Sequence, residues 1–296
     1  MIIDLAESIT YRGLDINTTV LGNGRVAGYT VEEVRLMPID GVGYKEKRSL
    51  ADGFDYGPVY LGKRDIFVRG VVYGEDANDH AQKRYNLLSA FNPALCYKAA
   101  PLDHGFHALE FIVPYWNPVG PKSMLVYARP SEVPGTLVLP ETNSQLDSPT
   151  SSLFELRLEC RDPRIYDASA TTMTITDGSN NLDQTVDGNA EPPVNFVFVT
   201  GDTSDFTFTF SGFGSQFTLS VAPGFPENSI VTVDSALKIV TVKQPSLVET
   251  LRMDLITFAA GTTWPQATEG ENTVTGTLTS ASPLNGAYMT YREAWY

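Results

Sequence analysis

Gly62-Lys-Arg-Asp-Ile-Phe-Val-Arg-Gly-Val-Val-Tyr-Gly74 is the stretch that decides the fold, and the segment from Asn78 to Ala90 follows it almost at once. Ile66, Val68 and Val72 share one face of an extended chain, because successive side chains of a β-strand point to opposite sides. The opposite face carries Asp65, Phe67, Arg69 and Val71. A strand with this pattern suits a sheet that is covered on both faces, and a neighbouring subunit could supply the second cover. The stretch therefore favours assembly over catalysis.

One short helix is predicted directly after this strand, over Asp79–Ala90. Its start is marked by residues that cap helices well and whose charge suits the positive helix end, namely Asp76, Asn78 and Asp79. Its apolar stripe is formed by Ala81, Tyr85 and Leu88 at spacing i, i+4, i+7, widened by Leu87. The helix is expected to end at Asn92-Pro93, because the residue before a proline avoids the helical conformation. Lys83 and Arg84 would lie on an open, solvated flank.

The bulk composition is that of a globular protein. The chain has 296 residues, enough for two domains of ordinary size, and 42% of them are hydrophobic. The sequence contains no run of about 18 apolar residues, so we expect no membrane insertion. The first residues, Met-Ile-Ile-Asp-Leu-Ala-Glu, contain neither a basic nor a long apolar region, so no secretory signal is expected.

The chain has two cysteines, Cys96 and Cys160. Cys160 shares one face of a predicted strand with Phe154, Leu156 and Leu158, which indicates a buried thiol. Two cysteines without a secretory signal favour a reducing compartment, and a disulfide between them is the less favoured alternative.

Charge is distributed unevenly along the chain. Residues 1–165 contain 17 Lys+Arg and 21 Asp+Glu, a net charge of −4, whereas residues 166–296 contain 4 and 14, a net charge of −10. The second half is therefore a poor candidate for nucleic-acid binding, because affinity for phosphate requires Lys and Arg. The acidity is readily explained by solubility and self-repulsion.

Two domains are expected, residues 1–167 and residues 168–296. The strands predicted in the first domain are Ser8–Tyr11, Ile16–Leu21, Tyr29–Leu36, Val59–Tyr60, Asp65–Tyr73, Ala108–Pro114 and Leu153–Cys160. Gly41–Gly57, with four glycines and mixed charges, is expected to be a long exposed loop. The Pro-rich segment 114–152 is expected to be an excursion or arm, with strand-like pieces at Ser123–Ala128 and Thr136–Leu139.

The second domain is predicted to be an antiparallel β-sandwich, because short alternating strands recur with polar turns between them. The inward-facing residues are expected to be Val194, Phe196 and Phe198, then Phe206, Phe208 and Phe210, then Phe217, Leu219 and Val221. Ile230–Val233 and Leu237–Val242 are expected to form a hairpin around Asp234-Ser-Ala236. The predicted fold class is therefore mainly β, with a β-sandwich-like N-terminal domain that carries one short helix and a C-terminal β-sandwich.

Three segments invite a catalytic or binding interpretation, and each has a simpler structural one. Gly22-Asn-Gly24-Arg-Val-Ala27-Gly28 approaches a dinucleotide loop but leads into a strand rather than a helix, so a hairpin turn is predicted. Asp103-His104-Gly-Phe-His107 offers too few ligands for a zinc site, since the remaining histidine, His80, lies on the predicted helix. Ser211-Gly-Phe-Gly-Ser215 lies between apolar strands and is expected to be a turn. We therefore predict no catalytic, cofactor-binding or metal-binding residue and no cofactor.

Large aromatic residues gather towards the C-terminus of the sequence. Trp264, Tyr288, Tyr291 and Trp295 are candidates for a glycan or partner surface, because aromatic rings with polar neighbours stack on sugars or pack in interfaces. Thr290–Tyr296 alternates, with Tyr291, Glu293 and Trp295 on one face. A closing strand of the sandwich is the simpler interpretation.

Several of these features, in this order, resemble the distal tail protein family of long-tailed bacteriophages. The features are the early Gly13-Leu-Asp-Ile-Asn17 segment, a Gly-rich loop ending in Asp52-Gly-Phe-Asp-Tyr-Gly57, the strand Gly62–Gly74 with its helix, the closing Phe154-Glu-Leu-Arg-Leu-Glu-Cys-Arg-Asp-Pro-Arg-Ile-Tyr166 and the final Tyr291-Arg-Glu-Ala-Trp295. The resemblance covers most of the chain and is clearest over residues 53–92 and 153–167. The Pro-rich segment 114–152 is longer than the family pattern leads us to expect, which leaves its role open.

The resemblance implies a non-enzymatic structural protein of the virion, located at the phage tail tip and assembled in the host cytoplasm. Residues 1–167 would form a hexameric ring, a baseplate hub through which DNA passes, and residues 168–296 would be an outward-facing, galectin-like domain. The implied partners are the tail tube protein, the tape-measure protein and tail-associated hub and receptor-binding proteins. Segments 41–57 and 114–152 are plausible belts that reach a neighbouring copy.

Two alternatives remain beside this leading hypothesis. The C-terminal aromatic residues and the sandwich pattern suggest a carbohydrate-binding adhesion module that contacts host glycans. A glycoside hydrolase has the least support, since some pair of carboxylates will always lie close together in a chain with 35 acidic residues.

Overall fold

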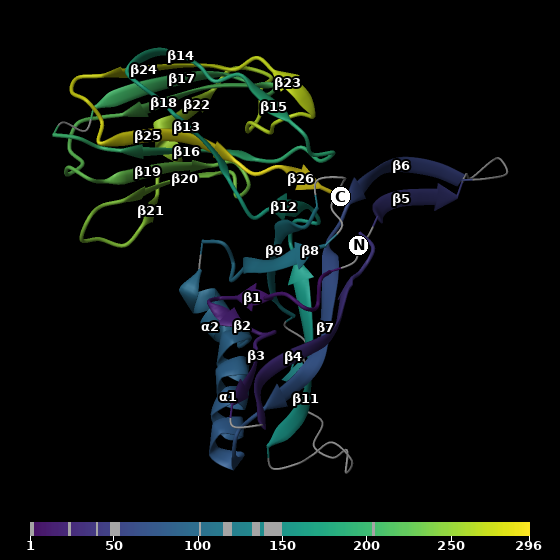
Figure 1. The fold of residues 1–296 in the computed structure, drawn as a ribbon. Coiled ribbons are helices and arrows are strands. Elements are labelled where there is room, and N and C mark those ends of the chain that lie inside the picture. The colour runs from purple at the N-terminus through teal and green to yellow at the C-terminus, as the bar shows by residue number, and fades with distance from the viewer. Residues whose placement is uncertain are drawn as a thin grey trace. The chain divides into compact units, whose positions relative to one another are not determined.

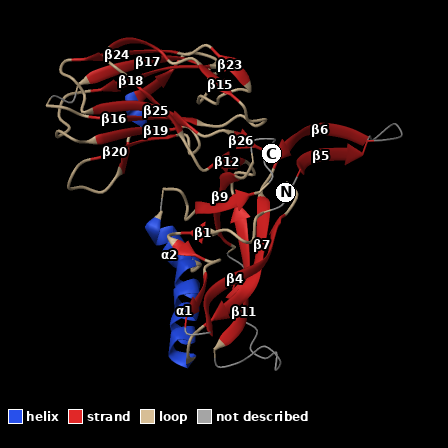
Figure 2. Cartoon of the chain, viewed as in Figure 1, coloured by secondary structure: helices blue, strands red, loops and turns tan. Residues whose placement is uncertain are grey.

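A computed structural model of the chain describes residues 3–22, 25–39, 41–47, 54–100, 102–114, 120–131, 137–138, 150–202 and 205–296. The chain divides into two compact units, Met1–Ile165 and Tyr166–Tyr296. Strands make up most of both units, so the predicted fold class, mainly β, is confirmed (Figures 1 and 2).

The first unit contains one large antiparallel sheet, a separate hairpin and two helices. Its strands are β1 (Thr10–Tyr11), β2 (Leu14–Asp15), β3 (Thr19–Gly22), β4 (Arg25–Leu36), β5 (Gly41–Lys47), β6 (Phe54–Leu61), β7 (Arg64–Tyr73), β8 (His107–Val113), β9 (Lys122–Pro130), β10 (Leu137–Val138) and β11 (Ser151–Cys160). The helices are α1 (Ala77–Ala90) and α2 (Pro93–Ala99). The strand order in the sheet is β2-β1-β8-β9-β11-β7-β4-β3, and β10 pairs with β11.

Strand β7 is a central strand of this sheet, as its sequence pattern predicts. It pairs with β11 along its whole length and with β4 on its other side. Ile66, Val68 and Val72 are buried on one face, whereas Asp65 and Arg69 are exposed on the other. The apolar side of the strand therefore belongs to the core of the first unit.

Two helices follow β7, so the expectation of a single helix is wrong. Asn92-Pro93 does separate them, but Pro93 stands in the first turn of α2, where a missing N–H costs nothing. The Asn92 side chain caps α2 by accepting hydrogen bonds from the backbone N–H groups of Ala94 (2.9 Å) and Leu95 (3.3 Å). The same dipeptide that ends one helix starts the next.

The expected loop over Gly41–Gly57 is largely a β-hairpin, which corrects that prediction. Strands β5 and β6 pair with each other, and within the described residues they join no other sheet. The pairing shifts register between Gly43 and Lys45, a position where a glycine readily accommodates a bulge. The hairpin is held by backbone hydrogen bonds between its two strands. Its glycines and charged residues are typical of a loop, so the sequence pattern did not predict strands here. Residues 48–53 lie outside the described residues.

The segment 114–152 contributes a core strand, which confirms the strand-like piece predicted at Ser123–Ala128 and corrects the expectation of an excursion for this part. Strand β9 lies between β8 and β11, and its Met124, Leu125, Val126 and Ala128 are buried. The strand itself was predicted from the sequence, whereas its place inside the sheet was not. Residues 115–119, 132–136 and 139–149 lie outside the described residues.

The second unit contains two larger antiparallel sheets. Their orders are β13-β25-β16-β19-β20-β21 and β14-β24-β17-β18-β22, and β15 pairs separately with β23. The strands of the chain from its boundary onwards are β12 (Ile165–Asp167), β13 (Thr171–Thr174), β14 (Gly178–Asn181), β15 (Gln184–Val186), β16 (Val194–Val199), β17 (Phe206–Gly212), β18 (Ser215–Val221), β19 (Ile230–Asp234), β20 (Ile239–Lys243), β21 (Thr250–Leu251), β22 (Ile256–Phe258), β23 (Gly270–Asn272), β24 (Thr275–Ser280), β25 (Gly286–Tyr291) and β26 (Ala294–Trp295). A 3₁₀ turn, η1, spans Met253–Leu255.

Phenylalanines from both sheets fill the core of the second unit. Phe196 of β16 lies 4.8 Å from Phe210 and 5.5 Å from Phe208 of β17, measured between ring centroids. Phe217 of β18 lies 5.2 Å from Phe210. The alternation predicted for these strands is confirmed, since each of these rings is buried. Aromatic packing between two sheets is what joins them into a sandwich.

Within the part of the chain that the structure describes, no helix combines the length and the apolar character that a bilayer span requires.

Candidate functional site

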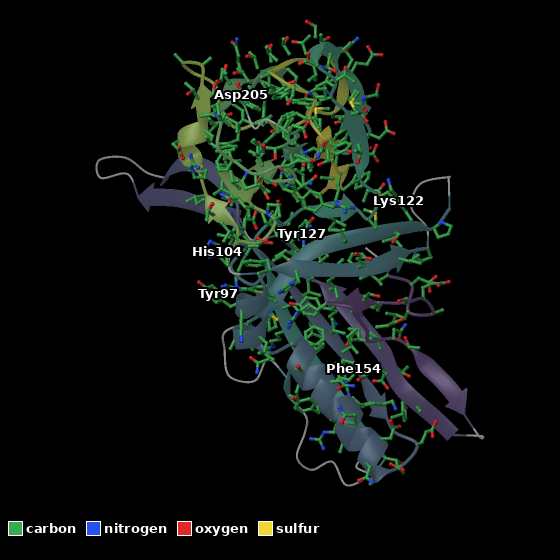
Figure 3. The ribbon with its side chains drawn as sticks, turned by 90° about the vertical axis from the view of Figure 1, so that its left-hand side faces the viewer. Tyr97, His104, Lys122, Tyr127, Phe154 and Asp205 are labelled. Carbon is green, nitrogen blue, oxygen red and sulfur yellow. The ribbon has the colours of Figure 1, made fainter. Side chains whose placement is uncertain are left out.

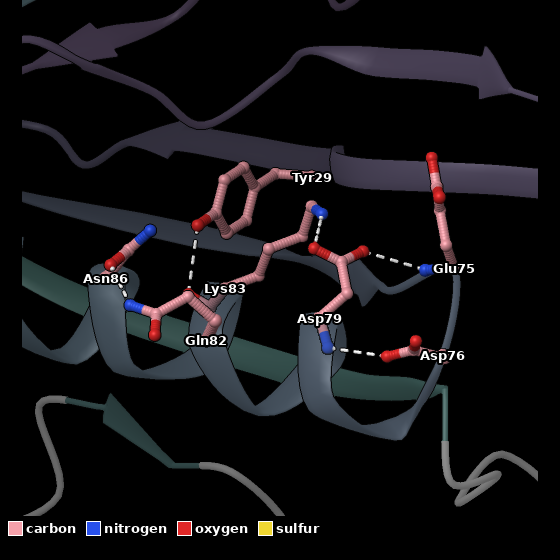
Figure 4. A network of polar contacts seen from close by, with 7 residues as sticks. All are labelled: Tyr29, Glu75, Asp76, Asp79, Gln82, Lys83 and Asn86. Atoms are coloured by element: carbon pink, nitrogen blue, oxygen red, sulfur yellow. Dashed lines mark hydrogen bonds and ion pairs between the residues drawn. The ribbon is translucent and has the colours of Figure 1, made fainter.

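The first turn of α1 is held by carboxylates and by one tyrosine of the sheet (Figure 4). Asp76 caps the helix by accepting a hydrogen bond from the backbone N–H of Asp79 (2.8 Å). Asp79 accepts one from the backbone N–H of Glu75 (2.8 Å) and pairs with Lys83, whose hydrogen bond keeps the pKa of Asp79 below its usual range. Tyr29 of β4 donates its hydroxyl to the carbonyl of Lys83 (2.9 Å). These contacts fix which side of α1 faces the sheet.

The side of α1 that faces the sheet is only partly apolar. His80 is buried, and its Nε2 lies 3.0 Å from the hydroxyl of Ser152 on β11. Leu87, about two turns later, is fully buried. Phe91, just after the helix, stacks on Tyr11 with the ring centroids 4.5 Å apart. A polar contact at one end and two apolar contacts at the other therefore dock the helix.

The predicted apolar stripe of α1 faces solvent, so that prediction is wrong. Ala81 is exposed, Tyr85 is 66% exposed and Leu88 is 43% exposed, whereas only the added Leu87 is buried. The hydrogen bond of His80 and the contact of Tyr29 with the Lys83 carbonyl set the rotation of the helix. Lys83 and Arg84 are half-buried, so the expectation of an open, solvated flank is also corrected.

Helix α2 adds further exposed apolar side chains. Leu95 is 41% exposed and Tyr97 is 54% exposed, on either side of the buried Cys96. Figure 3 shows Tyr97 at the edge of the first unit, on the same side as His104. We call Tyr85, Leu88, Leu95 and Tyr97 the helical apolar surface. Large aromatic and aliphatic groups exposed on two successive helices are typical of a surface that contacts another protein.

The aromatic residues predicted for a glycan or partner surface do not share one face. Tyr291 is buried, and its hydroxyl lies 3.2 Å from Oε1 of Gln184. Trp264 packs on the core of the second unit, with its ring 5.0 Å from that of Phe258. Tyr288 and Trp295 are half-buried, and Tyr288 points to the side of β25 opposite Tyr291. Only part of the predicted set is therefore placed to meet a ligand.

Thr290–Tyr296 does not form one closing strand. Strand β25 ends at Tyr291, and β26 begins only at Ala294, which is buried. Asp167 N–H bonds to the carbonyl of Glu293 at the break (2.9 Å), and Arg292 bonds to the carbonyls of Asp167 and Ala168. Hydrogen bonds therefore hold the first residues of the second unit against the last residues of the chain.

Each of the three histidines lies in a different environment. His107 is half-buried, its Nε2 lies 3.0 Å from the carbonyl of Cys96, and burial lowers its pKa. His104 is exposed with a φ of 51°, and His80 bonds to Ser152 as described. Among the described residues no cluster of three or more His, Cys, Asp or Glu side chains is arranged to hold a metal ion.

The two predicted hairpins are confirmed by the pairing of their strands, and residues 23–24 of the first lie outside the described residues. Gly22 pairs with Arg25 at the end of an antiparallel hairpin between β3 and β4, so this glycine segment leads into a strand. Gly212 pairs with Ser215, and the intervening Phe213 and Gly214 have φ of 50° and 65°, as a tight hairpin turn between twisted strands requires.

Both cysteines are buried free thiols. Burial raises the pKa of the Cys160 thiol to about 12. The Sγ of Cys96 lies 3.6 Å from the hydroxyl of Tyr11. The predicted core position of Cys160 is confirmed, and the alternative of a disulfide is not formed in this structure.

The chain shares its fold with a phage protein of known structure. The SPP1 Dit protein, described as a paradigm of the hub adsorption apparatus in phages that infect Gram-positive bacteria, matches with a TM-score of 0.53 and 15% identity, over 98% of this chain and 99% of that one. Chains of the phage p2 baseplate in its activated conformation, with Sr and with Ca, match with TM-scores of 0.49 and 0.48 at 7% identity, over 88% of this chain and 90% of theirs. No protein-family model and no curated protein sequence matches the chain.

Proposed function

We propose that this chain is a structural, non-enzymatic component of a phage tail tip, which forms a ring that joins the tail tube to the host-recognition apparatus. The observation that carries the proposal is the fold shared with the SPP1 hub protein across both units, over 98% of this chain. In this proposal residues 1–167 of six copies form the ring, and residues 168–296 face outward. The chain would work in the virion after assembly in the host cytoplasm, bound to tail tube, tape-measure, hub and receptor-binding proteins.

Two features of the first unit support contacts between copies. The β5–β6 hairpin extends beyond the main sheet (Figure 1) and, within the described residues, pairs with no other strand. An isolated two-stranded hairpin is marginally stable in water, so a neighbour that covers it would stabilise it. The helical apolar surface offers a second contact, and a ring requires two different surfaces on each copy.

The mass of the full chain in solution, measured by light scattering over a range of concentrations, tests this proposal. We expect a species of about six times 32.4 kDa, alone or after addition of tail tube protein. The double variant Tyr85→Ser, Leu88→Ser should raise the midpoint concentration of assembly about tenfold, because it removes two apolar contacts. Met37→Ser removes an exposed apolar side chain outside the helices and is the matched control. A chain that stays monomeric at every concentration, with and without tail tube protein, would contradict the proposal.

A specific observation favours a second function, carbohydrate binding by the second unit. A Cβ atom on Gly286 would lie 2.8 Å from the hydroxyl oxygen of Tyr288 and 2.9 Å from its ring. The Tyr288 ring therefore lies along β25 over this glycine, on the face opposite the core. A half-buried aromatic ring on the outer face of a sheet offers an apolar surface that could stack on the face of a sugar.

A glycan array of host cell-wall sugars, probed with the full chain, tests this second function. Tyr288→Ala should abolish any sugar binding, whereas Tyr291→Phe, which changes only a buried hydroxyl, should preserve it. Sugar binding that survives Tyr288→Ala would exclude Tyr288 as the binding site, and it would not affect the ring proposal.

A further inference from the structure

A hollow lined by several cationic side chains lies on the first unit. It has a volume of about 400 Å³, within the range of small-molecule and peptide sites. Lys63 precedes β7, Arg129 lies on β9, and Arg161 follows β11. Phe106 and Cys160 also line it, and both are buried. The hollow therefore combines an apolar floor with positively charged groups from three parts of the chain.

Arg129 is held rigidly in this hollow. Its Nε donates to Oε1 of Glu159 (2.7 Å), and its Nη1 donates to the carbonyl of His104 (2.9 Å). Its guanidinium lies 4.7 Å from the centroid of the Phe106 ring, a cation–π contact. His104, labelled in Figure 3, has a left-handed backbone that directs its carbonyl to this arginine. A guanidinium fixed in advance loses little conformational freedom when an anion binds.

The charges of the hollow do not balance. Among the described residues that line the hollow, Lys63, Arg129 and Arg161 are cations and Glu159 is the one carboxylate. Glu159 pairs with Arg129 (2.7 Å) and lies 4.0 Å from the amine of Lys63, which pairs with Asp65 beside the hollow (3.2 Å). Arg161 is exposed. A local excess of positive charge in a chain with a net charge of −14 marks a place where an anion is attracted.

Arg64 adds a second, independent observation next to the hollow. It follows Lys63 in the sequence and lies directly opposite Cys160 in the pairing of β7 with β11. It is only 7% exposed, and its Nε is the one buried side-chain nitrogen or oxygen among the described residues that has no hydrogen-bond partner. A buried cation without full compensation is costly, and a nearby anion would reduce this cost.

We propose that this hollow binds an acidic peptide segment of another protein, with glutamate side chains as its ligands. A glutamate has two methylene groups, which would lie on Phe106, and a carboxylate, which would meet Arg161 and Lys63. The cations stand on separate elements around an apolar floor, an arrangement that suits several carboxylates along a chain better than one compact phosphate. The proposal holds whether or not the chain forms a ring.

Calorimetric titration of the full chain at low salt, with a blocked hexaglutamate peptide as the probe, tests this inference. We expect binding by the unmodified chain, and a dissociation constant about five- to tenfold weaker for Arg161→Gln. Arg161→Lys retains the charge and should recover most of the loss. Arg157→Gln, which removes an exposed arginine of β11 outside the hollow, should change the constant less than about twofold. Because Arg161 and Arg157 are both exposed, all three variants should fold.

Several outcomes would overturn the inference. An equal loss in Arg161→Gln and Arg157→Gln would mean diffuse attraction to the whole surface. If hexaglutamate gave no heat of binding at low salt, the proposed site would be excluded. Tighter binding of an oligothymidylate or of inorganic phosphate, with the same dependence on Arg161, would replace the acidic peptide by a nucleic acid or a simple anion.

Discussion

Two glycines of the stretch Gly62–Gly74 show how closely the first unit is packed. A Cβ atom on Gly70 would lie 2.3 Å from the carbonyl oxygen of Thr30 and 2.7 Å from the Phe154 ring. A Cβ atom on Gly74 would lie 2.3 Å from the backbone nitrogen of His80. The first glycine lets β4 and an aromatic ring approach β7, and the second lets α1 begin directly above the sheet. These are packing requirements, and neither glycine needs a left-handed backbone.

The thiol of Cys160 makes the stability of the first unit depend on pH. Burial raises its pKa from an ordinary value of 9.0 to about 12, so above about pH 9 the unfolded chain loses a proton that the folded chain retains. The free energy of unfolding should therefore fall as the pH rises from about 9 to 12. Cys160→Ala should flatten this dependence, measured as urea midpoints at about pH 8 and about pH 10.5. Tyr29, whose pKa burial raises to about 12, would leave a residual slope in the variant. Identical slopes in the two proteins would show that the thiol does not contribute.

The sequence could not show which side of α1 faces the sheet, and single residues explain why. The spacing of Ala81, Tyr85 and Leu88 predicts a buried stripe, yet a histidine and Leu87 occupy the sheet side of α1. A buried His80 can be recognised only when its partner, Ser152, is known to lie opposite it. That partner is 72 residues away, so no local pattern contains the information.

At the scale of elements, the N-terminus of α1 depends on one capping side chain. Asp76→Ala should lower the free energy of unfolding by about 1 kcal/mol, because the backbone N–H of Asp79 loses its acceptor. Asn78→Ala, an exposed position in the same turn, is the control and should have a smaller effect. Urea denaturation followed by circular dichroism measures both. An equal effect of the two substitutions would mean that the cap contributes nothing.

The elements that were predicted are those whose own side chains alternate against a core. Strand β7 and the phenylalanine strands β16, β17 and β18 were recognised for this reason. The hairpin β5–β6 and helix α2 were missed, because a hairpin is defined by backbone pairing and α2 begins at a proline that equally signals an end. Of the helical apolar surface, Tyr85 and Leu88 were therefore predicted as apolar residues of α1 but not as exposed ones, and Leu95 and Tyr97 of α2 were not predicted.

The second unit has a buried core made of its own residues. The buried cluster of phenylalanines and aliphatic side chains in the second unit runs from Ile175 to Tyr291, entirely within Tyr166–Tyr296. The core of β7 belongs to Met1–Ile165. We therefore expect two calorimetric unfolding transitions rather than one.

Phe208→Ala should shift only one of these transitions. Phe208 is fully buried in the second unit, so its truncation should cost that unit about 3–5 kcal/mol. Thr207→Ala changes the exposed neighbour on the same strand and should leave both transitions in place. Equal shifts of both transitions in Phe208→Ala would show that the two units unfold as one.

The seclusion of both cysteines has a practical consequence. Cys96 and Cys160 are buried, and the sequence contains no other sulfhydryl. One cysteine introduced at an exposed position would thus be the only thiol that reacts rapidly with a labelling reagent. A spin label or dye attached there could report distances between copies in an assembled particle, and Cys96 and Cys160 would not have to be replaced first.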